Sequence, residues 1–152
     1  MRVRAPPDEL LEGFLTEWQR LLDLVAEPST VILVEGSRDR SALERLGLAS
    51  PVLLVHRGER LPQLARSVAE RYRRAIVLTD WDRTGGQLAQ RLRLLLEADQ
   101  VEIDLEVRRR IGRALRGELV HVEGLRAWAE HVAERAGTTW AVEVARRSGA
   151  PR

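Results

Sequence analysis

Apolar and polar positions form alternating blocks along the chain, and each block has the period of a helix or of a buried strand. Apolar residues recur at helical spacing between Leu10 and Val25, which predicts an amphipathic helix that ends before Pro28. Asp8, which follows two prolines, is a candidate N-cap of that helix. We expect the apolar stripe to cover one face of a sheet; a second copy of the chain, in a homodimer, is the alternative partner.

Short apolar runs then alternate with amphipathic segments of about ten residues. Three runs predict strands, at residues 31–34, 52–55 and 75–79, and the first is typical of a strand buried on both faces. Helices are expected at 38–46, which Gly47 closes, and at 61–72 and 84–96. Further along, the pattern predicts a weaker strand, a helix, a fifth strand and a last helix, at 101–103, 104–115, 119–122 and 125–136.

Strands that alternate with helices imply right-handed crossovers and a parallel sheet. The predicted fold class is therefore α/β, a Rossmann-like parallel sheet of about four strands flanked by helices, with extra N- and C-terminal helices. We predict three parts: an N-terminal helix that packs on the core (1–28), the α/β domain (29–136) and a C-terminal tail without a predicted element (137–152).

Composition narrows the classes of protein further. With 152 residues, 44% of them apolar, the chain is long enough for one domain with a sizeable core. It has no cysteine, which excludes disulfides and thiolate metal ligands. The N-terminal residues lack a signal-peptide pattern, and no apolar run is long enough to span a membrane, so we expect a cytoplasmic protein with no membrane partner.

The charge pattern gives a weaker indication. All 25 basic residues are arginine, which explains an isoelectric point near 10.2 at a net charge of only +2. Segments 57–74 and 108–116 are rich in arginine, whereas 8–27 is acidic on balance. An arginine-rich face suits phosphate groups, and ordinary solvated helix faces are the alternative explanation.

Acidic residues and glycines stand where two predicted strands end. Glu35 and Gly36 follow the first strand, and Asp80 and Asp82 follow the third. In an open parallel sheet, ligands bind beyond the carboxyl ends of the strands, so we expect these side chains to meet at one edge. Three carboxylates suit a hard divalent cation, Mg²⁺ or Mn²⁺, and without one they would repel each other. The alternative is that Asp80 and Asp82 only cap the next helix.

Two segments resemble the motifs of the Toprim family. Residues 31–39, VILVEGSRD, are similar to the first motif, a hydrophobic strand followed by Glu-Gly, a basic residue and an Asp. Residues 76–85, IVLTDWDRTG, are similar to the second, a hydrophobic strand followed by Asp-x-Asp-x-x-Gly. The motifs lie about forty-five residues apart with one strand and one helix between them, which also fits the family. The resemblance covers roughly residues 28–130 and is greatest to small stand-alone Toprim proteins of archaea and bacteria.

The Toprim family includes primases, topoisomerases, nucleases and ribosomal-RNA maturases. The resemblance implies Mg²⁺- or Mn²⁺-dependent chemistry on nucleic-acid phosphodiesters, and a small nuclease similar to the RNA maturases is the best match. Glu35 would be a general acid/base or a metal ligand, and Asp80 and Asp82 would be catalytic residues that hold the metal ion. The only tyrosine, Tyr72, lies far in sequence from both motifs, which argues against a topoisomerase.

The chain departs from the family at Ser37, where many members have lysine. Arg38 or Arg83 would then supply the missing positive charge. Arg38, Arg57 and Arg83 are the predicted contacts to RNA or DNA.

Two other functions fit parts of the pattern. A non-catalytic, metal-dependent nucleic-acid-binding or regulatory module would use the same carboxylates for binding alone. Residues 80–84, DWDRT, also match the Asp-x-Asp-x-Thr motif of haloacid-dehalogenase-type phosphatases, in which the first Asp is the nucleophile. That chemistry needs a later basic residue and a downstream acidic pair; the chain has no lysine, and Glu35 would be unexplained.

For five further residues the sequence leaves several interpretations open or offers none. His56 is a proton shuttle, a phosphate contact or a solvated loop histidine. Glu123 is an extra metal ligand or a residue at a helix start. Trp81 is a packing residue or a platform on which a base stacks. His121 and His131 show no metal-ligand spacing with acidic residues.

Overall fold

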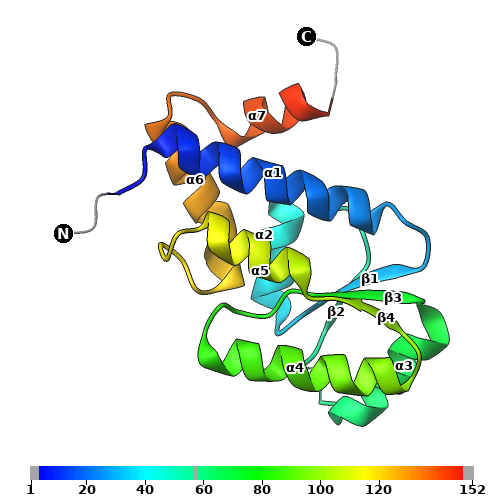
Figure 1. The fold of residues 1–152 in the computed structure, drawn as a ribbon. Helices are drawn as coiled ribbons and strands as arrows, with labels where there is room; N and C mark the ends of the chain where they lie inside the picture. Colours follow the sequence, from blue (N-terminus) through cyan, green and yellow to red (C-terminus); the bar gives the residue numbers. More distant parts are fainter. Residues whose placement is uncertain (1–3, 57, 149–152) are drawn as a thin grey trace.

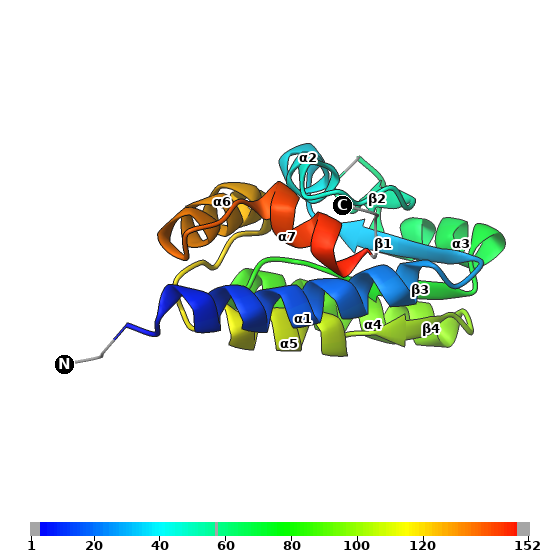
Figure 2. The same cartoon turned by 90° about the horizontal axis from the view of Figure 1, so that it is seen from above.

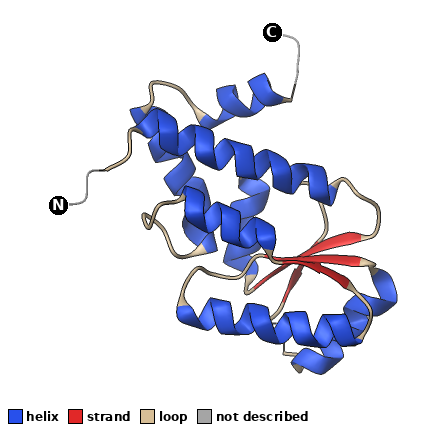
Figure 3. Ribbon diagram, viewed as in Figure 1, coloured by secondary structure: helices blue, strands red, loops and turns tan. Residues whose placement is uncertain are grey.

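The computed structural model describes residues 4–56 and 58–148 and contains a wholly parallel, four-stranded sheet in the order β2-β1-β3-β4. The strands are β1 (Thr30–Val34), β2 (Val52–Leu54), β3 (Arg74–Val77) and β4 (Glu102–Asp104). The helices are α1 (Pro7–Val25), α2 (Ser37–Arg45), α3 (Leu61–Arg71), α4 (Arg83–Ala98), α5 (Glu106–Ala114), the 3-10 turn η1 (Val122–Gly124), α6 (Leu125–Arg135) and α7 (Trp140–Arg147). The predicted α/β class is confirmed (Figures 1 and 3).

Helices cover both faces of the sheet, because the central strands are apolar on both sides. All five residues of β1 are buried. Ile32 and Val34 face a core that includes α1, α2, α5, α6 and α7, whereas Val31 and Leu33 face α3 and α4. Figure 1 shows these two helical layers on opposite sides of the strands, and Figure 2 looks down on the layer that contains α1. The two central strands are therefore buried from both sides, as the continuous apolar run of β1 predicts.

The N-terminal helix α1 is part of the larger core. Its stripe meets two other helices through an aromatic group, in which Phe14 lies 5.2 Å from Trp128 and 5.6 Å from Trp140 between ring centroids. Trp18 lies 6.0 Å from Trp140 in an edge-on arrangement. The prediction that α1 packs on the core is confirmed. Asp8 as its N-cap is wrong, because Pro6 is the N-cap residue and Asp8 lies inside the first turn of α1, where its negative charge favours the helix dipole.

The predicted fifth strand at 119–122 is wrong. Its backbone bonds to the turn after β3 instead of to a strand: the carbonyl of Val120 accepts the Trp81 N–H at 2.7 Å. The N–H of Val122 donates to Asp80 Oδ1 at 2.8 Å, and η1 begins there. This short apolar segment therefore forms hydrogen bonds with the turn after β3 and does not add a strand to the sheet.

The segment from residue 137 onward contains α7, which the pattern did not predict. Thr139 caps this helix by accepting the Val142 N–H at 3.2 Å. Trp140 is buried and donates from its indole N–H to the carbonyl of Leu46 at 3.0 Å. An eight-residue helix held by one large aromatic side chain shows too little periodicity to be recognised from sequence. None of the helices within the described ranges is long and apolar enough to cross a lipid bilayer.

Candidate metal centre

The predicted acidic residues meet at the carboxyl ends of the two central strands. Glu35 directly follows β1, and Asp80 lies three residues beyond β3. Glu35 Oε2 accepts the backbone N–H of Asp80 at 2.9 Å, across 45 residues of sequence. The parallel pairing of β1 with β3 brings the two turns together, as expected for an open α/β sheet.

Two hydrogen bonds and a close backbone contact fix the backbone conformation of the turn from β3 into α4. Asp82 caps α4, with its Oδ1 accepting the Gly85 N–H at 2.7 Å, and Thr79 donates its hydroxyl to the Gly85 carbonyl at 2.7 Å. A Cβ at position 85 would lie 2.0 Å from the carbonyl oxygen of Asp80, so only glycine fits there. The alternative capping role is thus correct for Asp82, but Asp80 does not cap the helix and instead accepts the Val122 N–H.

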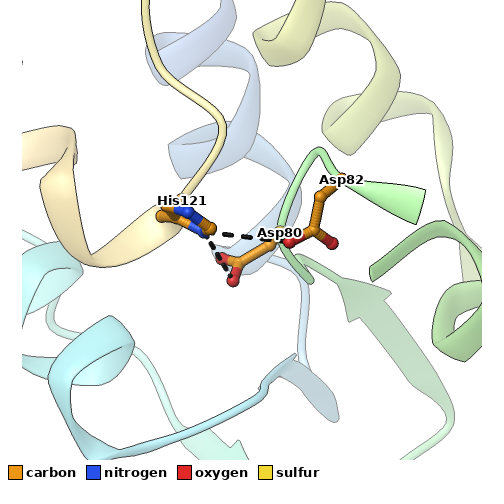
Figure 4. Close-up of side chains that lie close together, drawn as sticks. All are labelled: Asp80, Asp82 and His121. Atoms are coloured by element: carbon orange, nitrogen blue, oxygen red, sulfur yellow. Dashed lines mark hydrogen bonds and ion pairs between the residues drawn. The ribbon is translucent and has the colours of Figure 1, made fainter. Parts of the chain in front are cut away.

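A histidine joins the two aspartates (Figure 4). One ligand atom from each of Asp80, Asp82 and His121 lies within 4.8 Å of the others, a spacing that would let the three share a metal ion. His121 Nδ1 is 3.2 Å from Asp80 Oδ2 and 3.9 Å from Asp82 Oδ2. The hydrogen bond to Asp80 and then the two negative charges raise the pKa of His121. Without a metal ion, a protonated His121 offsets the charge of the aspartates.

Glu35 lies beside this cluster at a hollow of about 490 Å³, whose lining also includes Asp39, Asp80, His121 and Glu123. Burial raises the pKa of Glu35, and the neighbouring charge of Asp80 adds to the rise. Asp39, at the same edge, accepts the Gly36 N–H at 3.0 Å and thereby fixes the start of α2; burial raises its pKa too. Of the carboxylates, Glu35 is the one that combines access to the hollow with a raised pKa and no helix to cap.

Arg108, in α5, donates hydrogen bonds to the backbone of the β3–α4 turn. Its Nε donates to the carbonyl of Thr79 at 3.0 Å, and its Nη2 donates to the carbonyl of Asp80. In return, the Trp81 indole N–H donates to the Arg108 carbonyl at 2.7 Å. Burial lowers the pKa of Arg108, while Asp82, Glu35 and Asp80 favour its charged form. This arginine therefore supplies a positive charge close to all three predicted carboxylates.

The other predicted residues lie at different distances from the cluster. Arg38 is exposed at the rim of the hollow, Arg83 is exposed at the first position of α4, and Arg57 lies outside the described residues. His56 is exposed with its Nε2 3.8 Å from Glu35 Oε1, and Ser37 also lines the hollow.

The structure also places the other three candidate residues, Trp81, Glu123 and His131. Trp81 packs against the core and against Gly112, where a Cβ would lie 2.5 Å from its ring, which agrees with the packing interpretation. Glu123 lies in η1 at the start of α6 and also lines the hollow. His131 is exposed on α6.

Sequence reasoning missed His121 and Arg108. His121 is 41 residues from Asp80, and Arg108 is 28 residues from it, so no local spacing connects them. His121 also lies in a segment predicted as a strand, whereas its irregular backbone is what turns it toward the aspartates. The one usable signal was that a histidine directly precedes the Val122–Gly124 turn.

Fold and site together define an α/β protein with a carboxylate–histidine cluster at the carboxyl edge of its parallel sheet. Its sequence is 34% identical to a UPF0292 protein of Thermococcus gammatolerans over 116 residues, which cover 74% of this chain and 85% of that protein. It is 32% identical to a UPF0292 protein of Pyrococcus horikoshii over 108 residues, 71% of this chain and 80% of the relative. The chain belongs to the UPF0292 family.

A more distant relative and a solved structure extend the comparison. A UPF0292 protein of Methanosarcina barkeri is 29% identical over 139 residues, 84% of this chain and 92% of that protein. A protein of Aquifex aeolicus with a solved structure has a TM-score of 0.58 and 26% identity, over 72% of this chain and 95% of that one. No protein-family model matches the chain. These names state no activity, so a function must be argued from the site.

Proposed function

We propose that this protein is a Toprim-like, metal-dependent phosphodiesterase that acts on nucleic acid, with Asp80, Asp82 and His121 holding Mg²⁺ or Mn²⁺ and Glu35 beside them. The observation that carries the proposal is the meeting of these four side chains at the carboxyl edge of the sheet, beside an open hollow. Glu35-Gly36 and Asp80-x-Asp82-x-x-Gly85 are the same residues that resemble the two Toprim motifs.

The donor set suits a divalent cation. Two carboxylates bind Mg²⁺ and Mn²⁺ well, whereas imidazole is a ligand that transition metals use more readily than Mg²⁺. With His121 in the set, we expect Mn²⁺ to bind more tightly than Mg²⁺. When bound, the cation would stabilise negative charge on phosphoryl oxygens.

Glu35 is suited to move a proton. Its Oε2 is engaged by the Asp80 N–H, whereas Oε1 lies on the side of His56, whose Nε2 is 3.8 Å away. Because burial raises its pKa, Glu35 holds a proton at a higher pH than an ordinary glutamate, which suits a general acid or base working near neutrality. Asp82, in contrast, uses one oxygen to cap α4 and keeps the other for the cluster.

The experiment is a cleavage assay with end-labelled structured RNA, single-stranded DNA and double-stranded DNA, each with Mg²⁺, Mn²⁺ or EDTA. The variants are Glu35→Gln and Asp80→Asn, with Glu70→Gln, an exposed position on α3, as the matched control. Cleavage that needs metal and is lost in both variants but not in the control is the expected result. Metal-dependent binding without turnover would indicate the regulatory module instead. Phosphate release from a small phosphomonoester that survives Glu35→Gln would indicate a phosphatase.

A further inference from the structure

A second hollow, of about 590 Å³, runs between α2 and the η1–α6 segment. Arg38, Ser41 and Arg45 line it from α2, and Glu123, Arg126 and Glu130 line it from the other side. Arg38 and Glu123 also line the hollow beside Glu35 and Asp80. The two hollows therefore meet, and the groove leads away from the candidate metal centre.

The α2 wall of this groove carries two positive charges, Arg38 and Arg45, that no ion pair within the described residues holds, while the charge of Arg45 also acts on Glu130 across the groove. Arg38 and Arg45 are both exposed, and neither guanidinium makes an ion pair or hydrogen bond with a side chain in residues 4–56 and 58–148. They are seven residues apart, so they lie on one face of the helix about 10.5 Å from each other along its axis. That length corresponds to roughly three phosphates of a stacked strand, which rises about 3.4 Å per phosphate.

The opposite wall, formed by η1 and α6, is fixed by hydrogen bonds, and its arginine is paired with a glutamate. Arg126 donates from Nη2 to Glu130 Oε1 at 2.6 Å and from Nη1 to the carbonyl of Arg45. The pKa of Glu130 is lowered, first by that hydrogen bond from Arg126, so Glu130 is ionised and paired. Glu123 remains as the negative residue, at the end where the groove meets the metal centre. The groove thus has a cationic wall and an acidic end.

We propose that a single strand of nucleic acid lies in this groove, with its phosphates against Arg38 and Arg45 and the adjoining phosphodiester at the metal centre. The proposal rests on the proposed function and adds to it the path of the substrate. The volume lies within the range of small-molecule pockets, about 300–1,000 Å³, which is too small for a duplex and suits one strand that lies along the open groove. Arg91, an exposed arginine on α4, belongs to the helical layer on the opposite face of the sheet.

The test is fluorescence anisotropy with a labelled twelve-nucleotide strand, made as DNA and as RNA, and with the corresponding DNA duplex. The full chain is used with EDTA, so that binding is measured apart from catalysis. The variants are Arg45→Gln and Arg38→Gln, and Arg91→Gln, which removes the same charge from the other face, is the control. Circular dichroism verifies that each variant is folded.

We expect Arg45→Gln to weaken single-strand binding about fivefold at 0.1 M salt and to lower the slope of log K against log salt by about 0.7, the loss of one phosphate contact. Arg38→Gln should act similarly, and Arg91→Gln should change neither quantity. Equal weakening by all three variants, or duplex binding as tight as single-strand binding, would overturn the groove. If the Arg38 and Arg45 variants weaken binding but no metal-dependent cleavage is found, single-strand binding in the groove is supported and the proposed catalysis is contradicted. If cleavage exists and the Arg45 and Arg38 variants bind normally, the catalysis stands while the groove fails.

Discussion

The two strand-to-helix turns that form the candidate site are built on one plan but are held differently. In each turn one aspartate fixes the start of the following helix: Asp39, inside α2, accepts the Gly36 N–H at 3.0 Å, and Asp82, the N-cap of α4, accepts the Gly85 N–H at 2.7 Å. Each turn also places a second carboxylate, Glu35 or Asp80, at the end of its strand.

The difference lies in what surrounds each turn. The turn after β3 is enclosed, with Arg108 bonded to two of its carbonyls and residues 120–122 bonded to Asp80 and Trp81. The turn after β1 is open, and a Cβ added to Gly36 would meet nothing within 4 Å. A fixed turn suits residues that hold a metal ion, and an open one suits a residue that meets substrate.

The largest effect is expected at Gly85. Gly85→Ala would place a methyl group 2.0 Å from the carbonyl of Asp80, so the turn must deform, at a cost of about 3 kcal/mol or more in the free energy of unfolding. The matched control is Gly86→Ala, where the new Cβ would lie 3.9 Å from Arg108 and alanine favours the helix. Urea unfolding followed by circular dichroism measures both. Equal stability of the two variants would show that the enclosed turn is not rigid.

Removal of Arg108 should have the next largest effect. Arg108→Ala leaves the carbonyls of Thr79 and Asp80 without their donor, which costs about 2 kcal/mol of stability. Because the turn then positions its aspartates less well, Mn²⁺ affinity should fall about tenfold or more. Arg109→Ala, the exposed neighbour on the same helix, is the control, and calorimetric titration gives the affinity. A metal affinity equal to that of the control would contradict the positioning role of Arg108.

His121 should decide which metal ion is preferred. His121→Ala removes the nitrogen donor, so the affinity for Mn²⁺ is expected to fall about tenfold and that for Mg²⁺ to fall less. His131→Ala removes an exposed histidine from α6 and serves as the control. Competition between the two ions, followed by calorimetry, measures the ratio. An unchanged ratio in His121→Ala would mean that the two aspartates bind the ion without the imidazole.

The smallest effect concerns pH. The pKa of His121 is raised in the folded protein by its bond to Asp80, so the folded state binds that proton more tightly than the unfolded state. In EDTA, this contribution to stability is complete below about pH 6.5, the ordinary histidine pKa, and is lost as the pH rises through the folded value. Urea midpoints measured upward from pH 6 should decline for the wild type. The part due to His121 should vanish in His121→Ala, and an identical decline in both proteins would exclude this ion pair as its cause.

The fold and the first half of the site could be predicted because their causes are local. A continuous apolar run such as Val31–Val34 indicates a strand buried on both faces, and carboxyl ends of parallel strands share one edge. These two rules suffice to bring Glu35 near Asp80 before any contact is known. The N-terminal helix follows from its stripe in the same way.

The rest of the site depends on packing between distant segments. Arg108 reaches the turn because α5 lies beside it, and Trp81 can lie against α5 because position 112 is a glycine. His121 reaches Asp80 because residues 120–122 bond to the turn instead of extending the sheet. Neither contact produces a periodic pattern or a fixed residue spacing in the sequence, so neither could be predicted from it.

The most direct test of the central claim is calorimetric titration of Mn²⁺ into the wild type and into the double variant Asp80→Asn/Asp82→Asn. Asparagine keeps the shape of both side chains, and it is as good an N-cap as aspartate, so the helix start at α4 should survive. The account predicts metal binding in the wild type and its loss in a folded double variant. Unchanged Mn²⁺ affinity in that variant would contradict the assignment of this edge of the sheet as a metal centre.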